Sequence, residues 1–355
     1  MTRDRSSDSG ESSDSERSRE PERSPDADRS GPDLPPDSNL PPEPDLSPES
    51  RRDGLSRLVW THDERRPTAP LRLVAAVVAV GVAFVGTSLS LAFLPLAGVA
   101  FTVVASLANP VVVSLAVLLV AYAVDRRRLA DLGLRRERGW LSDLWFGLAL
   151  GVGLQALVAG VGLAAGWYRL AGTLVGPPVG LLTALVLFLG VGFYEELLLR
   201  GYLLTNLGEW FSRHAGQRVA AGLALLASSG VFGAAHVANP GATAVSTLGI
   251  TFAGVFLGLG YLLTGRLSLP VGVHISWNYA QGAVFGFPVS GLDVGASLLA
   301  LEPTGPRAVT GGEFGPEAGL LGVLALCVGI GATVWWVRWR GGSGLDGRVL
   351  TLDRR

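Results

Sequence analysis

The stretch Phe193-Tyr194-Glu195-Glu196-Leu197-Leu198-Leu199-Arg200-Gly201 sets two adjacent carboxylates and an arginine inside an apolar run from Val179 to Leu204. A charged side chain near the centre of a bilayer costs a few kcal/mol, so acids are rare there unless they pair or have a function. This stretch therefore indicates a membrane helix that carries functional polar groups.

Helix geometry gives the two acids different surroundings. Successive residues point about 100° apart around a helix axis, so Glu195 and Glu196 cannot both face one cavity. Arg200 follows Glu196 by four residues, the spacing at which two side chains meet on one helix face. We expect Glu195 to face a polar cavity as the working carboxylate, and Glu196 with Arg200 to form a structural pair behind it.

The composition indicates a polytopic helical membrane protein. The chain has 355 residues, of which 48% are hydrophobic, and it contains 48 glycines. Apolar runs of about 20 residues recur along it, the length that a bilayer requires. The single cysteine, Cys327, excludes an intramolecular disulfide and a CxxC metal site. We expect a lipid bilayer as a partner and no nucleic acid.

The chain divides into four parts. Residues 1–60 are an acidic tail rich in Ser, Pro and Arg, which we expect to be disordered because it has too few apolar side chains to form a core. Residues 61–140 hold the first two transmembrane helices and a basic cytoplasmic loop. Residues 141–288 form the membrane core with the polar motifs, and 289–355 an outer loop, the last transmembrane helix and a short cytoplasmic tail. The expected fold is an all-α bundle of about eight transmembrane helices.

Eight apolar segments are the candidate spans: residues 73–94, 99–123, 143–166, 179–205, 219–237, 245–264, 269–288 and 317–337. The connections on one side contain 14 arginines, whereas those on the other contain only Arg169 and Arg307. Arginine is enriched in cytoplasmic loops. We therefore expect a multi-pass protein of the cell membrane with both termini cytoplasmic and an even number of spans.

Two of the four histidines lie in apolar runs, where ionisable groups are functional candidates. His236 follows Phe232 by one helical turn. His274 precedes Asn278 by the same spacing, so its imidazole and the carboxamide point into one space. Imidazole and carboxamide offer the hydrogen-bond donors of an oxyanion hole. His62 and His214 fall in segments expected outside the membrane.

Together these residues favour hydrolysis of a carbonyl compound. Glu195 would take a proton from a water molecule, and His236 would hold that water or shuttle its proton. His274 and Asn278 would donate to the oxygen that becomes negative. Taken singly, each histidine is equally typical of a hydrogen bond between packed helices. Three polar pairs on three spans, with no other acid expected within the spans, favour a shared site. Gln155, Gln281 and Trp277 are interpreted as packing or lining residues.

The ordered motifs resemble those of the CPBP family, the CAAX protease and bacteriocin-processing or Abi group of intramembrane proteases, which includes the type II CAAX prenyl endopeptidases. The family pattern is EExxxR, FxxxH and HxxxN on separate helices, which is matched here by Glu195-Glu196-xxx-Arg200, Phe232-xxx-His236 and His274-xxx-Asn278. The resemblance covers roughly residues 140 to 285. It implies a catalytic core in 141–288, catalytic Glu195, His236, His274 and Asn278, and supporting Glu196, Arg200 and Phe232.

The resemblance also implies an endopeptidase that acts on membrane-associated proteins or peptides. Where family members are prenyl-specific, the substrate carries a lipidated C-terminal cysteine. Glu195, His236 and His274 could supply three ligands to zinc. We favour a mechanism that requires no cofactor, because the carboxamide of an HxxxN motif suits an oxyanion and is unusual for zinc.

Two other functions fit the same residues. A proton-coupled transporter would use Glu195, His236 and His274 as a relay, and a non-enzymatic membrane scaffold or immunity-type protein would keep the fold without the chemistry. One expectation conflicts with a shared site. At about 1.5 Å per residue, Glu195 lies about 24 Å from the outer side, whereas His236 lies about 26 Å from the inner side. A common depth requires different boundaries for the fourth or fifth span.

Overall fold

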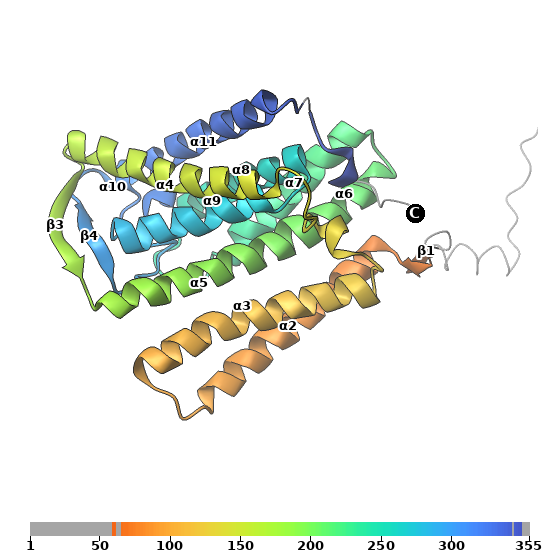
Figure 1. The fold of residues 1–355 in the computed structure, drawn as a ribbon, viewed down its shortest axis with the longest axis horizontal. Coiled ribbons are helices and arrows are strands. Elements are labelled where there is room, and N and C mark those ends of the chain that lie inside the picture. Colours follow the sequence, from red (N-terminus) through yellow and green to blue (C-terminus); the bar gives the residue numbers. More distant parts are fainter. Residues whose placement is uncertain (1–58, 62–64, 343, 350–355) are drawn as a thin grey trace, which may run out of the picture. The chain divides into compact units, whose positions relative to one another are not determined.

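The computed structural model describes residues 59–61, 65–342 and 344–349. Of the expected acidic tail, all but Val59 and Trp60 lie outside the described residues, as does His62. The described part is a helical bundle with two small sheets (Figure 1).

The main helices follow one another with short connections. They are α2 (Ala69–Ala92), α3 (Gly98–Ala123), α4 (Trp140–Ala164), α5 (Pro178–Glu196), α6 (Thr205–Ser212), α7 (Gln217–Ala235), α8 (Ala244–Thr264), α9 (Ser268–Tyr279), α10 (Arg307–Thr310) and α11 (Leu320–Trp339). Five shorter helical segments complete the set: η1 (Leu129–Leu132), η2 (Leu197–Leu204), η3 (Ala280–Val284), η4 (Pro316–Ala318) and η5 (Gly347–Val349).

All eight apolar segments expected from the sequence are helical. Seven helices in the described part of the chain are long and apolar enough to span a membrane. The eighth segment, expected at 269–288, consists of α9 and the π-helical η3, with 12 and 5 residues, and is too short to count among them. Every residue of α9 from Ser268 to Trp277 is buried, so this short helix is the centre of the bundle.

The fourth span is much longer than the sequence indicated. α5, the π-helical η2 and α6 form one continuous helix of 35 residues from Pro178 to Ser212, instead of ending near residue 205. From Glu195 to Ser212 this helix rises about 26 Å, and from Gln217 to His236 the fifth span rises about 28 Å. Glu195 and His236 therefore lie at similar depths. The conflict expected from the sequence disappears because the fourth span has about two further turns, up to Ser212, that were not expected.

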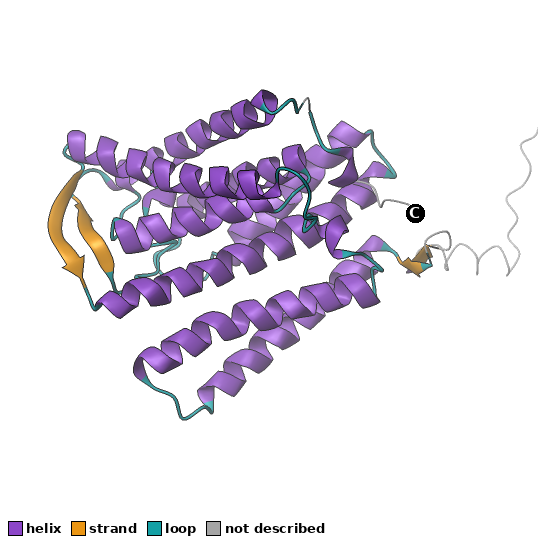
Figure 2. Cartoon of the chain, in the orientation of Figure 1, coloured by secondary structure: helices purple, strands orange, loops and turns teal. Residues whose placement is uncertain are grey.

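A two-stranded antiparallel sheet closes one end of the bundle (Figure 2). Strand β3 (Tyr168–Val175) pairs with β4 (Ser297–Pro303), in a register that runs from Tyr168 opposite Pro303 to Val175 opposite Ser297, with an irregularity near Leu170. We call this the sheet end, and the opposite end, which carries most of the loop arginines, the arginine end. The sequence did not indicate these strands, because pairing across more than 120 residues leaves no local signal.

Glycines let α4 approach α9 closely. A Cβ atom added to Gly147 would lie 2.4 Å from the backbone oxygen of Leu269, and one added to Gly151 would lie 2.6 Å from that of Val273. Membrane helices use small residues in this way to bring their backbones together. The contact fixes α9, and with it His274 and Asn278, against the bundle.

A buried ion cluster attaches the first two helices at the arginine end. Glu209 of α6 lies 2.5 to 3.0 Å from Arg127, Arg66 and Arg72, and Arg72 also lies 2.7 Å from Asp125. The second sheet lies just before α2 in the chain and includes Arg66 of this cluster. It has two strands of two residues each, β1 (Trp60–Thr61) and β2 (Arg66–Pro67).

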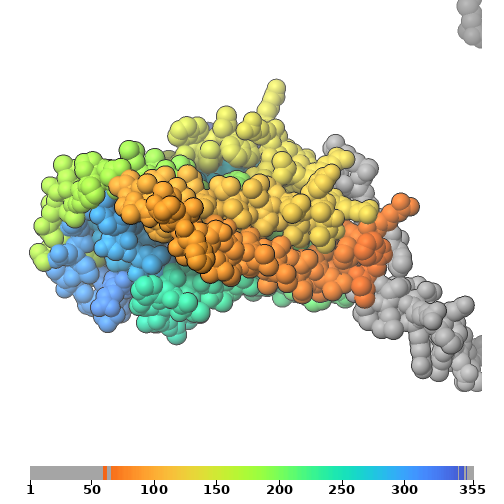
Figure 3. Space-filling model, turned by 90° about the horizontal axis from the view of Figure 1, so that it is seen from below, coloured from red at the N-terminus to blue at the C-terminus, as the bar shows by residue number. Residues whose placement is uncertain are grey.

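From this anchored end, α2 and α3 lie side by side across one face of the molecule, in orange and yellow in Figure 3. The cluster therefore joins these two helices to the long fourth span.

The variant Glu209→Gln should lower the unfolding free energy by about 3–5 kcal/mol, because it leaves the three buried guanidinium groups of the cluster with Asp125 as its only remaining acid. Thermal unfolding in detergent measures the effect. Glu302→Gln is the matched control, since Glu302 pairs with Arg169 at the exposed surface and such pairs contribute at most about 1 kcal/mol. Equal effects of the two changes would contradict a stabilising role for the cluster.

Candidate active site

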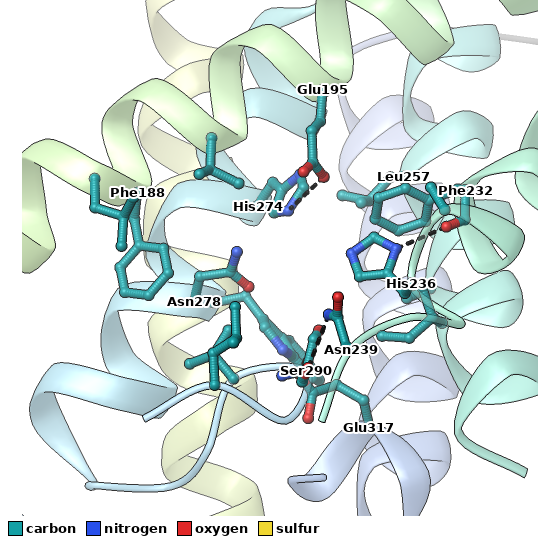
Figure 4. Close-up of a pocket in the computed structure, with 18 of the residues that line it drawn as sticks. Phe188, Glu195, Phe232, His236, Asn239, Leu257, His274, Asn278, Ser290 and Glu317 are labelled. Carbon is teal, nitrogen blue, oxygen red and sulfur yellow. Dashed lines mark hydrogen bonds and ion pairs between the residues drawn. The ribbon is translucent and has the colours of Figure 1, made fainter. Parts of the chain in front are cut away.

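One cavity is lined by most of the site residues expected from the sequence, namely Glu195, Phe232, His236, His274 and Asn278. Its volume is about 500 Å³, and its walls come from α5, α7, α8, α9 and the loop that follows η3, with Phe84 of α2 at one side. Figure 4 shows Glu195, His236, His274 and Asn278 around this hollow, with Glu195 and His274 opposite Ser290 and Glu317. The remaining walls are mostly apolar, so the polar side chains are confined to a few points.

Glu195 lies at the centre of the long helix and presents its carboxylate to the cavity. The hydroxyl of Tyr194 donates to its Oε1 at 2.9 Å. Its Oε2 has no hydrogen-bond partner among the described residues and lies 3.8 Å from Nε2 of His274. One carboxylate oxygen is thus held by Tyr194, and the other faces the imidazole of His274.

Glu196 forms the pair with Arg200 that its spacing indicated, and it also holds a histidine. Its Oε1 accepts from Nη1 of Arg200 at 2.7 Å and lies 2.8 Å from Nδ1 of His274. Its side chain is completely buried. Glu196 therefore does more than pair with Arg200 behind the site, because it also orients the imidazole of His274, which faces Glu195. Residue spacing within one helix gives no information on this contact between helices.

Arg200 connects the pair to two further helices. Its Nη2 donates to the backbone oxygen of Gly254 in α8 at 3.1 Å, and its guanidinium lies 4.6 Å from the ring centre of Phe232 in α7. Phe232 in turn meets both histidine rings edge to face, with ring centres 4.9 Å from His236 and 5.8 Å from His274. This phenylalanine is the spacer that separates the two imidazoles.

The hydrogen bonds to the two rings decide which nitrogen atoms carry protons. Nδ1 of His236 lies 2.7 Å from the carbonyl oxygen of Phe232, which only accepts, so Nδ1 donates and Nε2 of the neutral ring is an acceptor. Nδ1 of His274 faces the carboxylate of Glu196 in the same way. His274 therefore donates from Nε2 only when the ring is protonated.

Two π-helical segments begin immediately after the polar motifs. η2 starts at Leu197, next to Glu196, and η3 starts at Ala280, two residues after Asn278. π-Helical turns inside longer helices are rare and are frequent at functional sites. Here they follow the only two helices that bring a carboxylate or a carboxamide of the motifs to the cavity.

The three candidate zinc ligands do not gather as a metal site. Within residues 59–61, 65–342 and 344–349, no three His, Cys, Asp or Glu side chains are arranged to hold a metal ion. Nδ1 of each histidine is engaged, by Phe232 or by Glu196, so Nε2 is the ring nitrogen left to ligate a metal. The chemistry below is derived from the side chains themselves.

The far side of the cavity carries polar residues that were not expected from the sequence. Asn239, Ser290, Asp293 and Glu317 line it. The expectation of no other acid within the spans was wrong. Glu317 is the first residue of the last expected span, and its side chain, in η4 just before α11, is 3% exposed. Gln155 and Gln281, interpreted as packing residues, hydrogen bond to each other at 2.7 Å beside this group.

Comparison with known proteins gives one match. Residues 177–280 match the family model described as type II CAAX prenyl endopeptidase, Rce1-like. This region belongs to the Rce1-like family. No curated protein and no solved structure matches the chain.

The Rce1-like region begins next to the first residue of α5 and ends at the first residue of η3. It therefore contains all three polar motifs, whereas Glu317 and helices α2 to α4 lie outside it. The family is one of CAAX-type proteases, and the chain is a multi-pass membrane protein.

The variant Gly192→Ala should lower stability by about 1–3 kcal/mol, because an added Cβ atom would meet the backbone nitrogen of Ile275 in α9 at 3.0 Å. Thermal unfolding in detergent checks this. Gly153→Ala is the matched control, since nothing lies within 4 Å of its added Cβ atom. Comparable stability of both variants would show that α5 and α9 are not in close contact.

Stability should depend on pH through Glu317. Burial raises the pKa of Glu317 to about 7 from 4.5. The stabilisation by its protonated form is complete below about pH 4.5 and is lost as the pH rises through about 7. The unfolding free energy should therefore fall by at most about 3 kcal/mol across this pH range, which is measured as a falling thermal midpoint. The fall should be smaller in Glu317→Gln. An identical pH profile in this variant would contradict the assignment, whereas Glu313→Gln, at an exposed site, should leave the profile unchanged.

Proposed function

We propose that this protein is an intramembrane endopeptidase that hydrolyses peptide bonds of membrane-associated proteins. The observation that carries the proposal is the convergence of Glu195, His236, His274 and Asn278, from three helices, on one cavity inside a membrane bundle. The match of residues 177–280 to a protease family supports it.

The nucleophile is a water molecule held between Glu195 and His236. The carboxylate of Glu195 accepts a hydrogen bond from one O–H of this water, and Nε2 of His236 accepts a hydrogen bond from the other. As the water oxygen bonds to the carbonyl carbon of the substrate, the proton passes to Glu195. Breakage of the carbon–nitrogen bond then returns that proton to the leaving amine, so the carboxylate is regenerated.

The carbonyl oxygen of the substrate becomes negative during attack and is stabilised by donors across from the water. The carboxamide of Asn278 donates in every protonation state, and Nε2 of His274 donates when the ring is protonated. Glu196 supports the second donor because its carboxylate lies 2.8 Å from the opposite nitrogen of the ring. Arg200 pairs with Glu196 at 2.7 Å and holds it in place.

The substrate is a protein or peptide that reaches the cavity from the bilayer, and the Rce1-like match favours a C-terminally prenylated CAAX-type protein. The excess of arginine at one end of the bundle favours a cytoplasmic position for that end and for both termini. The cavity is mostly apolar, which suits an apolar segment of such a substrate.

Purified protein should cleave a fluorogenic membrane-anchored reporter peptide, and Glu195→Gln should lower kcat by about 10³-fold, within the range of lost general base catalysis. Asn278→Ala should lower it by about 10² to 10³-fold through the lost oxyanion donor. Glu313→Gln, at an exposed acid outside the cavity, is the control.

A transporter or a scaffold predicts a different result in the same experiment. Full reporter cleavage by Glu195→Gln, or no cleavage by the folded parent protein with prenylated and unmodified reporters alike, would contradict the proposed function. In cells, Glu195→Gln and His274→Ala should lose the phenotype of the parent, whereas a scaffold would keep it.

A further inference from the structure

A tight turn forms the wall of the cavity opposite Glu195. Val289 and Leu292 face each other in an antiparallel bridge, with backbone hydrogen bonds of 2.9 Å in both directions. Between them, Ser290 and Gly291 have φ angles of 48° and 83°. Two successive residues with positive φ define a type I′ turn, the two-residue connection that suits a hairpin.

Ser290 is an unfavourable residue for its position in this turn. Left-handed backbone conformations are strained for side chains other than glycine and persist where the surroundings enforce them. Gly291 beside it has no such cost, and no side chain would fit there, because an added Cβ atom would lie 2.0 Å from the backbone oxygen of Pro240. The conformation of Ser290 must therefore be held by its contacts.

Three contacts from two segments hold the turn. Oε1 of Glu317 accepts from the backbone N–H of Ser290 at 3.0 Å, and the side-chain amide of Asn239 donates to the carbonyl oxygen of Ser290 at 2.9 Å. The N–H of Gly291 donates to the carbonyl oxygen of Phe314 at 2.7 Å. Both backbone groups of Ser290 are thus bound by side chains that are distant in sequence.

Glu317 is the buried member of this set. Its side chain is 3% exposed, and its Oε1 lies within hydrogen-bond distance of both the backbone nitrogen and the hydroxyl of Ser290. A neighbouring amide supports the same segment, because Nε2 of Gln281 donates to the carbonyl oxygen of Pro288 at 2.6 Å. A buried carboxyl with these partners indicates a positioning role.

The turn presents apolar side chains to whatever occupies the cavity. Val289, Leu292 and Val294 line it, and Leu292 is 54% exposed. Figure 4 shows Ser290 and Glu317 across the hollow from Glu195 and His274. A substrate whose carbonyl group lies against Glu195 therefore extends toward this turn.

We propose that the turn 289–292 is a substrate-binding wall, and that Glu317 is a positioning residue that sets the place of this wall through the backbone of Ser290. The proposal rests on the proposed peptidase function. The wall accepts an apolar side chain of the substrate, which packs on Val289 and Leu292. Glu317 therefore governs substrate binding and has little influence on the chemical step at Glu195.

Kinetics with the reporter peptide test this assignment. Glu317→Ala should raise KM about 10-fold and leave kcat within about threefold, as expected when an anchoring hydrogen bond is lost and the reacting groups are intact. Glu317→Gln keeps an oxygen that accepts from Ser290 and should restore KM to within about threefold of the parent. Asn239→Ala, which removes the second anchor, should resemble Glu317→Ala. Glu313→Gln is the control.

Three kinetic results would overturn the proposal: an unchanged KM in both Glu317→Ala and Asn239→Ala, a loss of kcat at unchanged KM, or no rescue by glutamine. An unchanged KM would show that the turn has no role in binding, and a loss of kcat alone would assign Glu317 to the chemical step. A lack of rescue by glutamine would assign the effect to the charge of Glu317 instead of its hydrogen bond.

A second measurement is independent of activity. In a Cys327→Ser background, which removes the only cysteine, a spin label at Leu292→Cys should become more mobile when Glu317→Ala is added and should stay ordered with Glu317→Gln. A label at Leu170→Cys on β3, where leucine is equally exposed at 54%, should not respond.

An unchanged label at position 292 in Glu317→Ala would overturn the positioning role even if the enzyme is active. Failure of the parent protein to cleave the reporter, with the expected label response, would instead overturn only the peptidase function.

Discussion

The structure depends on how one buried carboxylate is neutralised. The side chain of Glu196 is fully buried and bound by Arg200 at 2.7 Å and by Nδ1 of His274 at 2.8 Å. A buried charge is tolerated only when it is paired and hydrogen bonded. These partners come from the same helix and from α9, so neutralising the charge also fixes the distance between the two helices that carry the catalytic candidates. The contacts that neutralise Glu196 therefore also set the relative positions of the candidate site residues on α5 and α9.

The ion pair also explains why Phe232 belongs to the site. Arg200 stacks on its ring, and the same ring meets both histidines at its edges. One aromatic side chain thus shields the guanidinium from the cavity and sets the orientation of two imidazoles. The helices α5, α7 and α9 are joined by these contacts without a continuous set of hydrogen bonds between them.

Sequence patterns predicted much of this arrangement. The helical ends agree with expectation within four residues for seven of the eight segments, because apolar runs and their flanking polar residues mark helices strongly. The pairing of Glu196 with Arg200 followed from spacing alone. The extension of the fourth span to Ser212 was missed because α6 contains polar residues, and it is their burial against the ion cluster that keeps this segment helical.

Contacts between distant segments were beyond local patterns. Nothing near Glu317 in the sequence indicates that its carboxyl meets Ser290, 27 residues away. The two strands at the sheet end and the contact of His274 with Glu196 were missed for the same reason. Spacing identifies which side chains share a helix face, but not which faces of different helices meet.

The position of α9 at the centre of the bundle also affects how the protein responds to its lipid surroundings. Bilayers differ in thickness, and helices that touch lipid tilt or shift to match them. α9 is buried from Ser268 to Trp277, whereas much of α2 faces outward. Lateral stress from the membrane is therefore taken up by the outer helices, so that His274 and Asn278 keep their places when the lipid composition changes.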